Sequence, residues 1–484
     1  MIQKTKDIES VVMNLFFIYA YIFFALIFLF FSNIFPLFFN NALGLVILTL
    51  MLCFLITKNS YVFIYITFPI LFIESSLSPW SNSFVKYFHN GIFEYVSLYH
   101  LFSFMCLFQV LLVRPLIDKK IIINIYLIFL LLLLFVAFIS IFKAFELDHI
   151  RLFQSLFFIQ NLAVVIFLYN WFSEWSLSQL QKLLKMIFLL VIILLCITPL
   201  LDRHLITHAM YFFLAISFPL IIYTGRYLKV NLFLKIIIIS FILIYVLDQG
   251  TGQGSSATTQ IIVCHSLFMS LLFIINKNLF NFFIICSLTA FIAVQFCFIF
   301  FTFFPNILIQ EFELIYDERF QQGIGFIQEI RFKLFADRSA IWMGVYNYLN
   351  EHSFIENLIN ASGQGFSPIF HGTFSSAERA ISEWIAGAHQ LILELTMNLG
   401  TFGATIFFIF LTKICLTIRK INHSLNDSKY FSLLLISILS YFLFPSFVAN
   451  FMLQSSSFLF WLSLALLMSF IKINFEQLNG KKNI

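Results

Sequence analysis

Two stretches of the sequence carry residues whose types and spacing could do chemistry on a negatively charged substrate. The first contains Arg338, whose permanent charge and planar fork of donors suit phosphate or pyrophosphate oxygens. The second begins at His389, where a neutral imidazole could take a proton from a hydroxyl, or its cation could contact an anion. Structural interpretations remain open for both: a surface ion pair between Arg338 and Asp337 or a glutamate, and an interfacial histidine that only hydrogen-bonds.

Other residues of these stretches could shape a binding site around the two charged groups. In the first stretch they are an aromatic residue and a glycine turn: Trp342, Gly363 and Gly365. In the second they are an amide, a carboxylate and two glycines: Gln390, Glu394, Gly400 and Gly403. The two glycines would let another helix approach closely, which is a packing role. A third stretch, residues 250–260, is uncharged and rich in small donors, and its simplest interpretation is a flexible turn.

The composition indicates what must hold these residues in place. Hydrophobic residues make up 61% of the 484 residues, charged residues 11%, and the mean hydropathy is +0.97. A soluble domain needs more charge to cover its surface, so we expect a chain solvated by lipid. The formal net charge of +5 is spread thinly along the chain, which excludes a nucleic-acid-binding signature. The seven cysteines show neither metal-ligand spacing nor a disulfide pattern.

Apolar runs predict a polytopic, all-α bundle of transmembrane helices. Crossing about 30 Å of hydrocarbon takes about 20 residues. The predicted spans are 11–31, 37–56, 61–74, 92–113, 121–142, 152–172, 186–200, 209–224, 232–248, 261–275, 279–304, 390–412, 431–449 and 455–471. The third and seventh are short enough to be re-entrant, so we expect about 12 to 14 spanning helices.

The basic residues predict the orientation. With the amino terminus inside, 19 of the 28 Lys and Arg residues fall on the inner side and four on short outer connections. The other five lie in one long loop, and long loops are exempt from the positive-inside rule. We therefore expect both termini in the cytoplasm and the loop outside. In a bacterium this is a multi-pass protein of the inner (cytoplasmic) membrane with a periplasmic loop.

The long loop divides the chain into three parts. Residues 1–304 would hold the first spanning helices, 305–389 the periplasmic loop, and 390–484 the last spanning helices and a cytoplasmic tail. The loop has a soluble composition, with ten acidic and five basic residues, and so a net charge of 5 − 10 = −5. A partly helical loop is expected, because apolar residues recur at helical spacing between Arg338 and Asn350. They are Ile341, Trp342, Val345, Tyr348 and Leu349.

The two chemical stretches resemble the signature segments of the O-antigen polymerase/ligase superfamily of polytopic membrane glycosyltransferases. That pattern is an Arg, a Trp four residues on and a later Gly-x-Gly, then His-Asn-x-x-Leu-Glu and two glycines. The matching residues are Arg338, Trp342, Gly363, Gly365, His389, Leu393, Glu394, Gly400 and Gly403, with Gln390 in place of Asn. Residues 250–260 resemble a Ser-x-Ser-Ala-Thr stretch of exopolysaccharide polymerases, and residues 204–219 a helix that follows a periplasmic turn. The ligase version of the former stretch has an Arg that this sequence lacks.

The resemblance implies a metal-independent glycosyltransferase that polymerises undecaprenyl-pyrophosphate-linked repeat units into O-antigen or a related surface polysaccharide, including exopolysaccharide. Arg338 would hold the departing pyrophosphate, with Arg203 and Arg331 as helpers. His389 would be either the base that activates the acceptor hydroxyl or a second pyrophosphate contact. The expected substrate-binding residues are Trp342, Gly363, Gly365, Gln390 and Glu394. We expect no metal and no cofactor, because the loop has no Asp-x-Asp stretch.

Other functions remain open. An O-antigen ligase would transfer the polysaccharide to lipid A core in lipopolysaccharide biosynthesis, and a protein O-oligosaccharyltransferase would use a protein acceptor. A flippase for the same lipid belongs to a different class, but transporters usually place charges on broken helices at the midplane, a pattern absent from this sequence. The partners implied are the lipid-linked glycan and the bilayer, together with a chain-length regulator for a polymerase.

Overall fold

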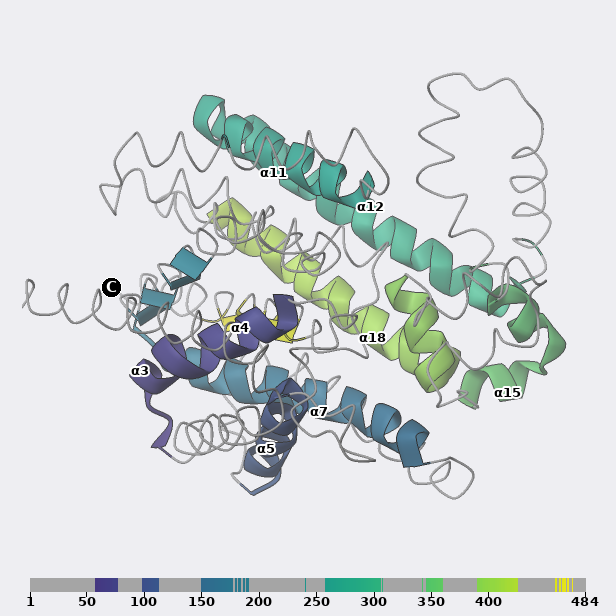
Figure 1. The fold of residues 1–484 in the computed structure, drawn as a ribbon. Helices are drawn as coiled ribbons and strands as arrows, with labels where there is room; N and C mark the ends of the chain where they lie inside the picture. The colour runs from purple at the N-terminus through teal and green to yellow at the C-terminus, as the bar shows by residue number, and fades with distance from the viewer. Residues whose placement is uncertain are drawn as a thin grey trace, which may run out of the picture.

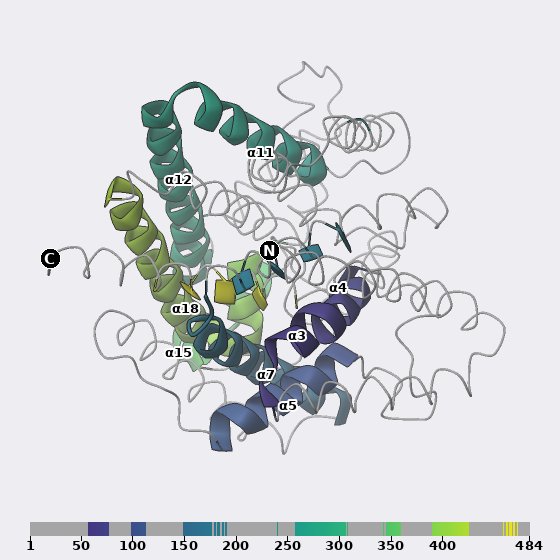
Figure 2. The same ribbon diagram turned by 90° about the vertical axis from the view of Figure 1, so that its left-hand side faces the viewer.

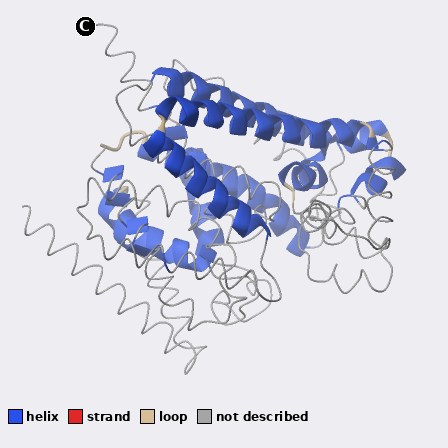
Figure 3. Ribbon diagram, turned by 90° about the horizontal axis from the view of Figure 1, so that it is seen from above, coloured by secondary structure: helices blue, strands red, loops and turns tan. Residues whose placement is uncertain are grey.

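The computed structural model describes residues 57–76, 98–112, 149–176, 257–305, 345–359 and 390–424, with single residues within 179–190 and 458–472 and at 240, 307 and 342. Nearly all of them are helical and none lies in a strand (Figure 3). The all-α prediction is confirmed for this part of the chain. Predicted helices at 11–31, 37–56, 121–142, 209–224 and 431–449 lie outside the described residues, and those at 186–200, 232–248 and 455–471 fall within them in part.

The described helices follow the predicted apolar runs closely. In chain order they are α3 (Ser60–Val62), the π-helix η1 (Phe63–Thr67), α4 (Phe68–Ser76), α5 (Leu98–Leu112), α7 (His149–Phe172), α11 (Ala257–Ile275), α12 (Lys277–Phe303), α15 (Phe354–Ile359) and α18 (Leu391–Ser424) (Figure 1). The first three form one continuous helix that coincides with the predicted run at 61–74. A single π-helical turn widens it, as occurs where an extra residue enters a helix.

One group of helices is built from α3, η1, α4, α5 and α7. Polar pairs join α5 to α7 inside an apolar contact: the Tyr99 hydroxyl donates to Asn161 Oδ1, and the Ser103 hydroxyl donates to Gln160 Oε1 at 2.9 Å. All four side chains are buried. Hydrogen bonds of this kind hold apolar helices together, because an unpaired polar group in an apolar contact is costly.

The second group contains α11, α12, α15 and α18. The helices α11 and α12 form a hairpin around Asn276, whose side chain caps α12 by accepting from the amides of Asn278 (2.9 Å) and Leu279 (3.3 Å). An asparagine at this position satisfies amides that the first helical turn leaves without partners. The longer part of α18 then packs along α12, with the rings of Phe296 and Phe408 6.2 Å apart.

Residues near the C-terminus join the two groups. The Phe458 ring lies 6.2 Å from that of Phe68 and 5.3 Å from that of Tyr99, both in the first group. Three residues later, the Trp461 ring lies 6.3 Å from that of Phe407 in α18. Both Phe458 and Trp461 are fully buried. This segment therefore forms part of a core shared by both groups.

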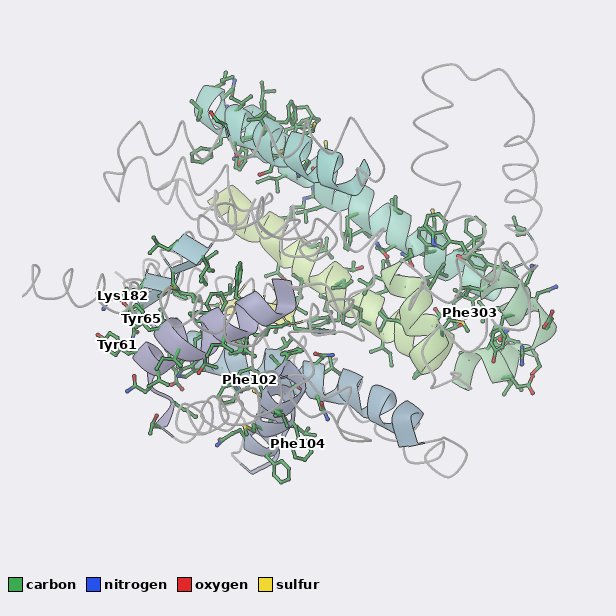
Figure 4. The ribbon with its side chains drawn as sticks, viewed as in Figure 1. Tyr61, Tyr65, Phe102, Phe104, Lys182 and Phe303 are labelled. Carbon is green, nitrogen blue, oxygen red and sulfur yellow. The ribbon has the colours of Figure 1, made fainter. Side chains whose placement is uncertain are left out.

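The molecule has two distinct ends. At one end, Lys182 Nζ lies 4.9 Å above the ring of Tyr61, Lys472 donates to the Ser173 hydroxyl (3.2 Å), and the Trp171 indole donates to the Lys58 carbonyl (3.2 Å). Phe303, α15 and Gly400 lie at the opposite end. In Figure 4, the label Lys182 marks the first end and the label Phe303 marks the opposite end. Helices α7, α12 and the longer part of α18 run between these ends (Figure 1), and Figure 2 shows the molecule from the side of Lys182.

Among the described helices, two stretches are long and apolar enough to cross a membrane: Asn278–Phe303 and Gly400–Thr417. The α11–α12 hairpin also exposes large apolar side chains on both of its helices. They are Phe268, Leu271, Ile274, Ile275, Leu279, Phe282, Phe296 and Phe300. Exposed apolar patches are typical of surfaces that contact a membrane or another protein.

The prediction of a single helix over 390–412 is wrong at Gly400. This residue has φ 72° and ψ 168°, a backbone conformation essentially restricted to glycine. The chain therefore forms a short helix over 391–399 and a separate, longer helix from 401. Gln390 and Phe408 contact consecutive residues of α12, although a straight helix would hold them about 27 Å apart. The short helix folds back beside the longer one (Figure 1).

Candidate functional site

The described residues of both sequence motifs meet around the last third of α12. Trp342, from the first motif, is 3% exposed and packs edge-on against Phe298 of α12, with ring centroids 5.1 Å apart. Gln390, from the second motif, bonds to Gln295 one helical turn earlier. We call this region the α12 junction, defined by Gln295, Phe298, Trp342, Gln390 and Gly400.

The helical segment that carries Trp342 shows why the loop packs against α12. Trp342, Val345, Tyr346 and Leu349 are buried, the spacing of one helical face. The Tyr346 hydroxyl donates to the Phe298 carbonyl at 3.3 Å. The predicted helix is confirmed where the residues are described, but its buried tyrosine is Tyr346. Tyr348 is half-buried and stacks on His352, with ring centroids 4.2 Å apart.

Helix α15 begins with reciprocal hydrogen bonds between Ser353 and Glu356. The Ser353 amide donates to Glu356 Oε2 (2.8 Å), and the Glu356 amide donates to the Ser353 hydroxyl (3.3 Å), which is a capping box. These bonds hold the pKa of the Glu356 carboxyl below its ordinary value, and the bond from the Ser353 backbone amide has the larger effect. The Asn357 side chain donates to the Leu349 carbonyl (2.5 Å), which ties α15 to the preceding helical segment.

Gly400 lies against the backbone of α15. A Cβ atom at this position would stand 2.6 Å from the Leu358 carbonyl oxygen and 3.2 Å from that of Asn357. The predicted role of Gly400 in close approach is confirmed, with the loop helix α15 as its neighbour. Phe354 of the same helix also contacts Phe303 (6.0 Å between centroids), so α15 connects the start of the longer helix to the end of α12.

Gln390 begins the short helix and joins it to α12. Its Oε1 accepts from the Leu393 amide at 2.7 Å, and its Nε2 donates to Gln295 Oε1 at 2.8 Å. The amide orientations follow from chemistry: a backbone N–H can only donate, so Gln390 must present its oxygen to Leu393 and its nitrogen to Gln295. The Nε2 of Gln295 then has no hydrogen-bond partner within the described structure, although Gln295 is 0% exposed.

The remaining site predictions can be placed only partly. Glu394 lies in the first turn of the short helix. The others lie outside the described residues: Arg203, Arg331, Arg338, Gly363, Gly365 and His389. Substrate contacts by Trp342 and Gln390 stay predictions, because the structure shows these side chains engaged with protein groups. Where residues are described, no group of three His, Cys, Asp or Glu side chains could hold a metal ion.

Sequence reasoning missed Gln295. The signal was available, since an amide in the middle of an apolar run has to be satisfied inside the membrane or against another helix. What the sequence could not supply was its partner, which lies 95 positions away at Gln390.

Comparison of the chain with protein-family models, curated proteins and solved structures finds no match. The functional argument therefore rests on the motif residues and on the geometry of the α12 junction. The chemical content of this junction is a buried amide pair beside a helix N-terminus. The positive end of a helix dipole and free backbone amides favour anionic groups at such a position.

Proposed function

We propose that this chain is a polytopic inner-membrane glycosyltransferase that polymerises undecaprenyl-pyrophosphate-linked repeat units at the periplasmic face. The observation that carries the proposal is the convergence of two separate motifs on one place, through Trp342 on Phe298 and Gln390 on Gln295. A loop that served only as a connection would not need to place an aromatic and an amide residue of the two motifs against the same end of α12.

Two features support the membrane part of the proposal. The α11–α12 hairpin exposes a wide apolar face, which lipid would cover. Lys58, Lys182 and Lys472 come from three connections assigned to the cytoplasm by the positive-inside rule, and all three lie at the same end. The α12 junction lies toward the other end, where the long loop would face the periplasm.

The proposed reaction transfers a glycan from its lipid pyrophosphate to a sugar hydroxyl. The acceptor oxygen forms a bond to the anomeric carbon while the bond from that carbon to the pyrophosphate oxygen breaks. The hydroxyl proton goes to His389 if that residue is the base, and the lipid pyrophosphate leaves with the electron pair. Arg338 stabilises the charge on this leaving group, because a guanidinium can hold two of its oxygens at once.

Substitution of His389 tests the function against its alternatives. In a polymerase, His389→Ala should abolish polymer yet leave single repeat units, which a separate ligase still transfers to lipid A core. A ligase would leave the core bare and accumulate long lipid-linked chains, and a flippase defect would strand the units on the cytoplasmic face. Gel and lipid analysis of the same cells separates the three. A bare core with accumulated chains would overturn the proposal in favour of a ligase.

The matched control is His352→Ala. This histidine lies in the same loop, and its Nδ1 is 2.8 Å from the Tyr348 carbonyl oxygen, so it serves the local fold. We expect the variant to keep a polymer ladder. Loss of polymer in both variants at normal protein levels would show that the assay reports loop integrity instead of chemistry at His389, and would remove its support for the proposal.

A further inference from the structure

The α12 junction contains a buried donor for which the described part of the chain provides no acceptor. Gln295 is 0% exposed, its Oε1 is occupied by Gln390, and its Nε2 has no partner in the described part of the chain. Burying an amide nitrogen without a partner is unfavourable, so such groups usually face a ligand or water. The Leu393 amide fixes the orientation of Gln390, whose Nε2 therefore faces Gln295. If the Gln295 amide were rotated, its Nε2 would face the Nε2 of Gln390, and two donors would lie against each other.

The surroundings of this donor favour an anionic oxygen. Gln295 is joined to the residue that caps the short helix 391–399, and the first amides of a helix have no partners within the helix. These amides and the helix dipole attract negative groups. No carboxylate contacts Gln295 among the described hydrogen bonds.

The depth of Gln295 in a bilayer follows from its position along α12. It lies eight positions before Phe303, about 12 Å along the axis of α12. With 27 residues, α12 is about 40 Å long, some 10 Å more than the hydrocarbon layer. With α12 centred on the hydrocarbon layer, Phe303 stands about 5 Å beyond it and Gln295 about 7 Å inside it, on the side of the long loop. The phosphate of a lipid-linked substrate would meet this donor by moving about 7 Å inward from the hydrocarbon surface.

We propose that Gln295 is a substrate-binding residue whose Nε2 donates a hydrogen bond to the pyrophosphate of the lipid-linked substrate. This rests on the proposed function and extends it to a helix outside both sequence motifs. Gln390 then has a positioning role, because its bond to Gln295 Oε1 directs the Gln295 amide nitrogen toward the ligand. The pair couples the short helix to the lipid-anchored end of the substrate.

The test measures the affinity of the full-length protein, in phosphatidylcholine nanodiscs, for undecaprenyl pyrophosphate, with undecaprenol as the uncharged comparison. In Gln295→Glu the carboxylate keeps an acceptor for Gln390 and loses the donor. We expect binding of undecaprenyl pyrophosphate near pH 8 to weaken about tenfold or more, because one hydrogen bond to a charged group is lost and the new carboxylate repels the pyrophosphate. Binding of undecaprenol should not change.

A pH series separates ligand contact from structural damage. When the introduced carboxyl is protonated it again carries a donor, so Gln295→Glu should recover affinity at pH 5. Each value is taken as a ratio to the wild type at the same pH, which cancels titration of the pyrophosphate and of His389. Gln295→Met has similar length but neither donor nor acceptor, and it should stay weak at both pH values. Gln295→Met also tests the proposal by itself if Gln295→Glu does not insert into the membrane.

The matched control is Gln160→Glu, the same change at a buried glutamine of α7 whose Oε1 accepts from Ser103. Its affinity for undecaprenyl pyrophosphate should equal that of the wild type. If the wild type does not prefer undecaprenyl pyrophosphate to undecaprenol, the proposed function fails. If the wild type shows that preference and both Gln295 variants retain it in full, the function stands and the role of Gln295 is wrong.

Discussion

At the residue scale, Gln390 illustrates how one amide can serve two elements. Its oxygen caps the start of the short helix 391–399 by accepting from the Leu393 amide, and its nitrogen donates to Gln295 on α12. Asparagine and aspartate cap helices well because their side chains are short. Glutamine is longer, and that extra length is what allows the second bond across to another helix.

Shortening Gln390 should separate these two contributions. We expect Gln390→Asn to keep the helix cap and lose the bond to Gln295, and Gln390→Ala to lose both. Each lost hydrogen bond that strands a buried partner costs about 1–3 kcal/mol, so the order of thermal stability should be wild type, Asn variant, Ala variant. Thermal unfolding in detergent measures it. An Asn variant as stable as the wild type would show that the Gln295 bond adds nothing to stability.

The sequence indicated the chemical type of the junction residues better than their partners. Trp342 is expected at the site and does meet α12, and the expected amide at 390 donates one hydrogen bond and accepts another there. Gln295 was missed, because the periodicity of apolar residues predicts a single helix and contains no information about which helix packs against it. Partners 95 positions apart follow from packing, which local spacing does not encode.

At the element scale, Gly400 decides how α18 is divided. The apolar pattern continues through it, so the sequence predicts one helix over 390–412, and a glycine within a helical run is tolerated at modest cost. The helix breaks because α15 presses its backbone against this position, leaving no room for a Cβ atom. The break depends on a contact from the long loop and could not be read from the run itself.

Substitution of Gly400 should therefore be much more damaging than substitution of Gly403. In Gly400→Ala the new Cβ meets the Leu358 carbonyl oxygen, and the backbone conformation alone is strained by about 1–3 kcal/mol. Gly403 lies in the helical part of α18, where alanine adds no backbone strain. Unfolding temperatures of the two variants test this. Equal losses would mean that the backbone conformation at Gly400 is not what limits the substitution.

The start of α15 should respond to acid through Glu356. Because its pKa is held below the ordinary value of 4.5 by the Ser353 bonds, the ionised carboxylate stabilises the cap at neutral pH. That contribution persists above the ordinary pKa and is lost as the pH falls through the lowered one. Hydrogen exchange of the amides of residues 354–359, corrected for intrinsic rates, should show protection lost only below about pH 4.5. Glu356→Gln keeps an acceptor and should remove this dependence.

At the scale of the whole molecule, the two ends differ in chemistry. One end gathers Lys58, Lys182 and Lys472 near Trp171 and Trp175, a combination typical of a cytoplasmic membrane interface. The other end holds α15, whose Phe354 and Ile355 are 58% and 69% exposed. Exposed apolar residues beside the end of α12 are suited to the opposite interface, close to where a lipid-linked substrate would arrive.

This difference predicts that Glu174 and Glu351 lie on opposite sides of the membrane. Both are exposed, and they lie where two helices finish at opposite ends of the molecule: Glu174 just after α7, and Glu351 as the last residue of the helical segment 345–351. Glu174→Cys and Glu351→Cys therefore form a matched pair. On intact spheroplasts, a membrane-impermeant thiol reagent should label Glu351→Cys above the background of the native cysteines and leave Glu174→Cys unlabelled. Lysis should make both reactive. Labelling of Glu174→Cys alone would invert the topology and move the α12 junction to the cytoplasmic face, where a periplasmic polymerase could not work.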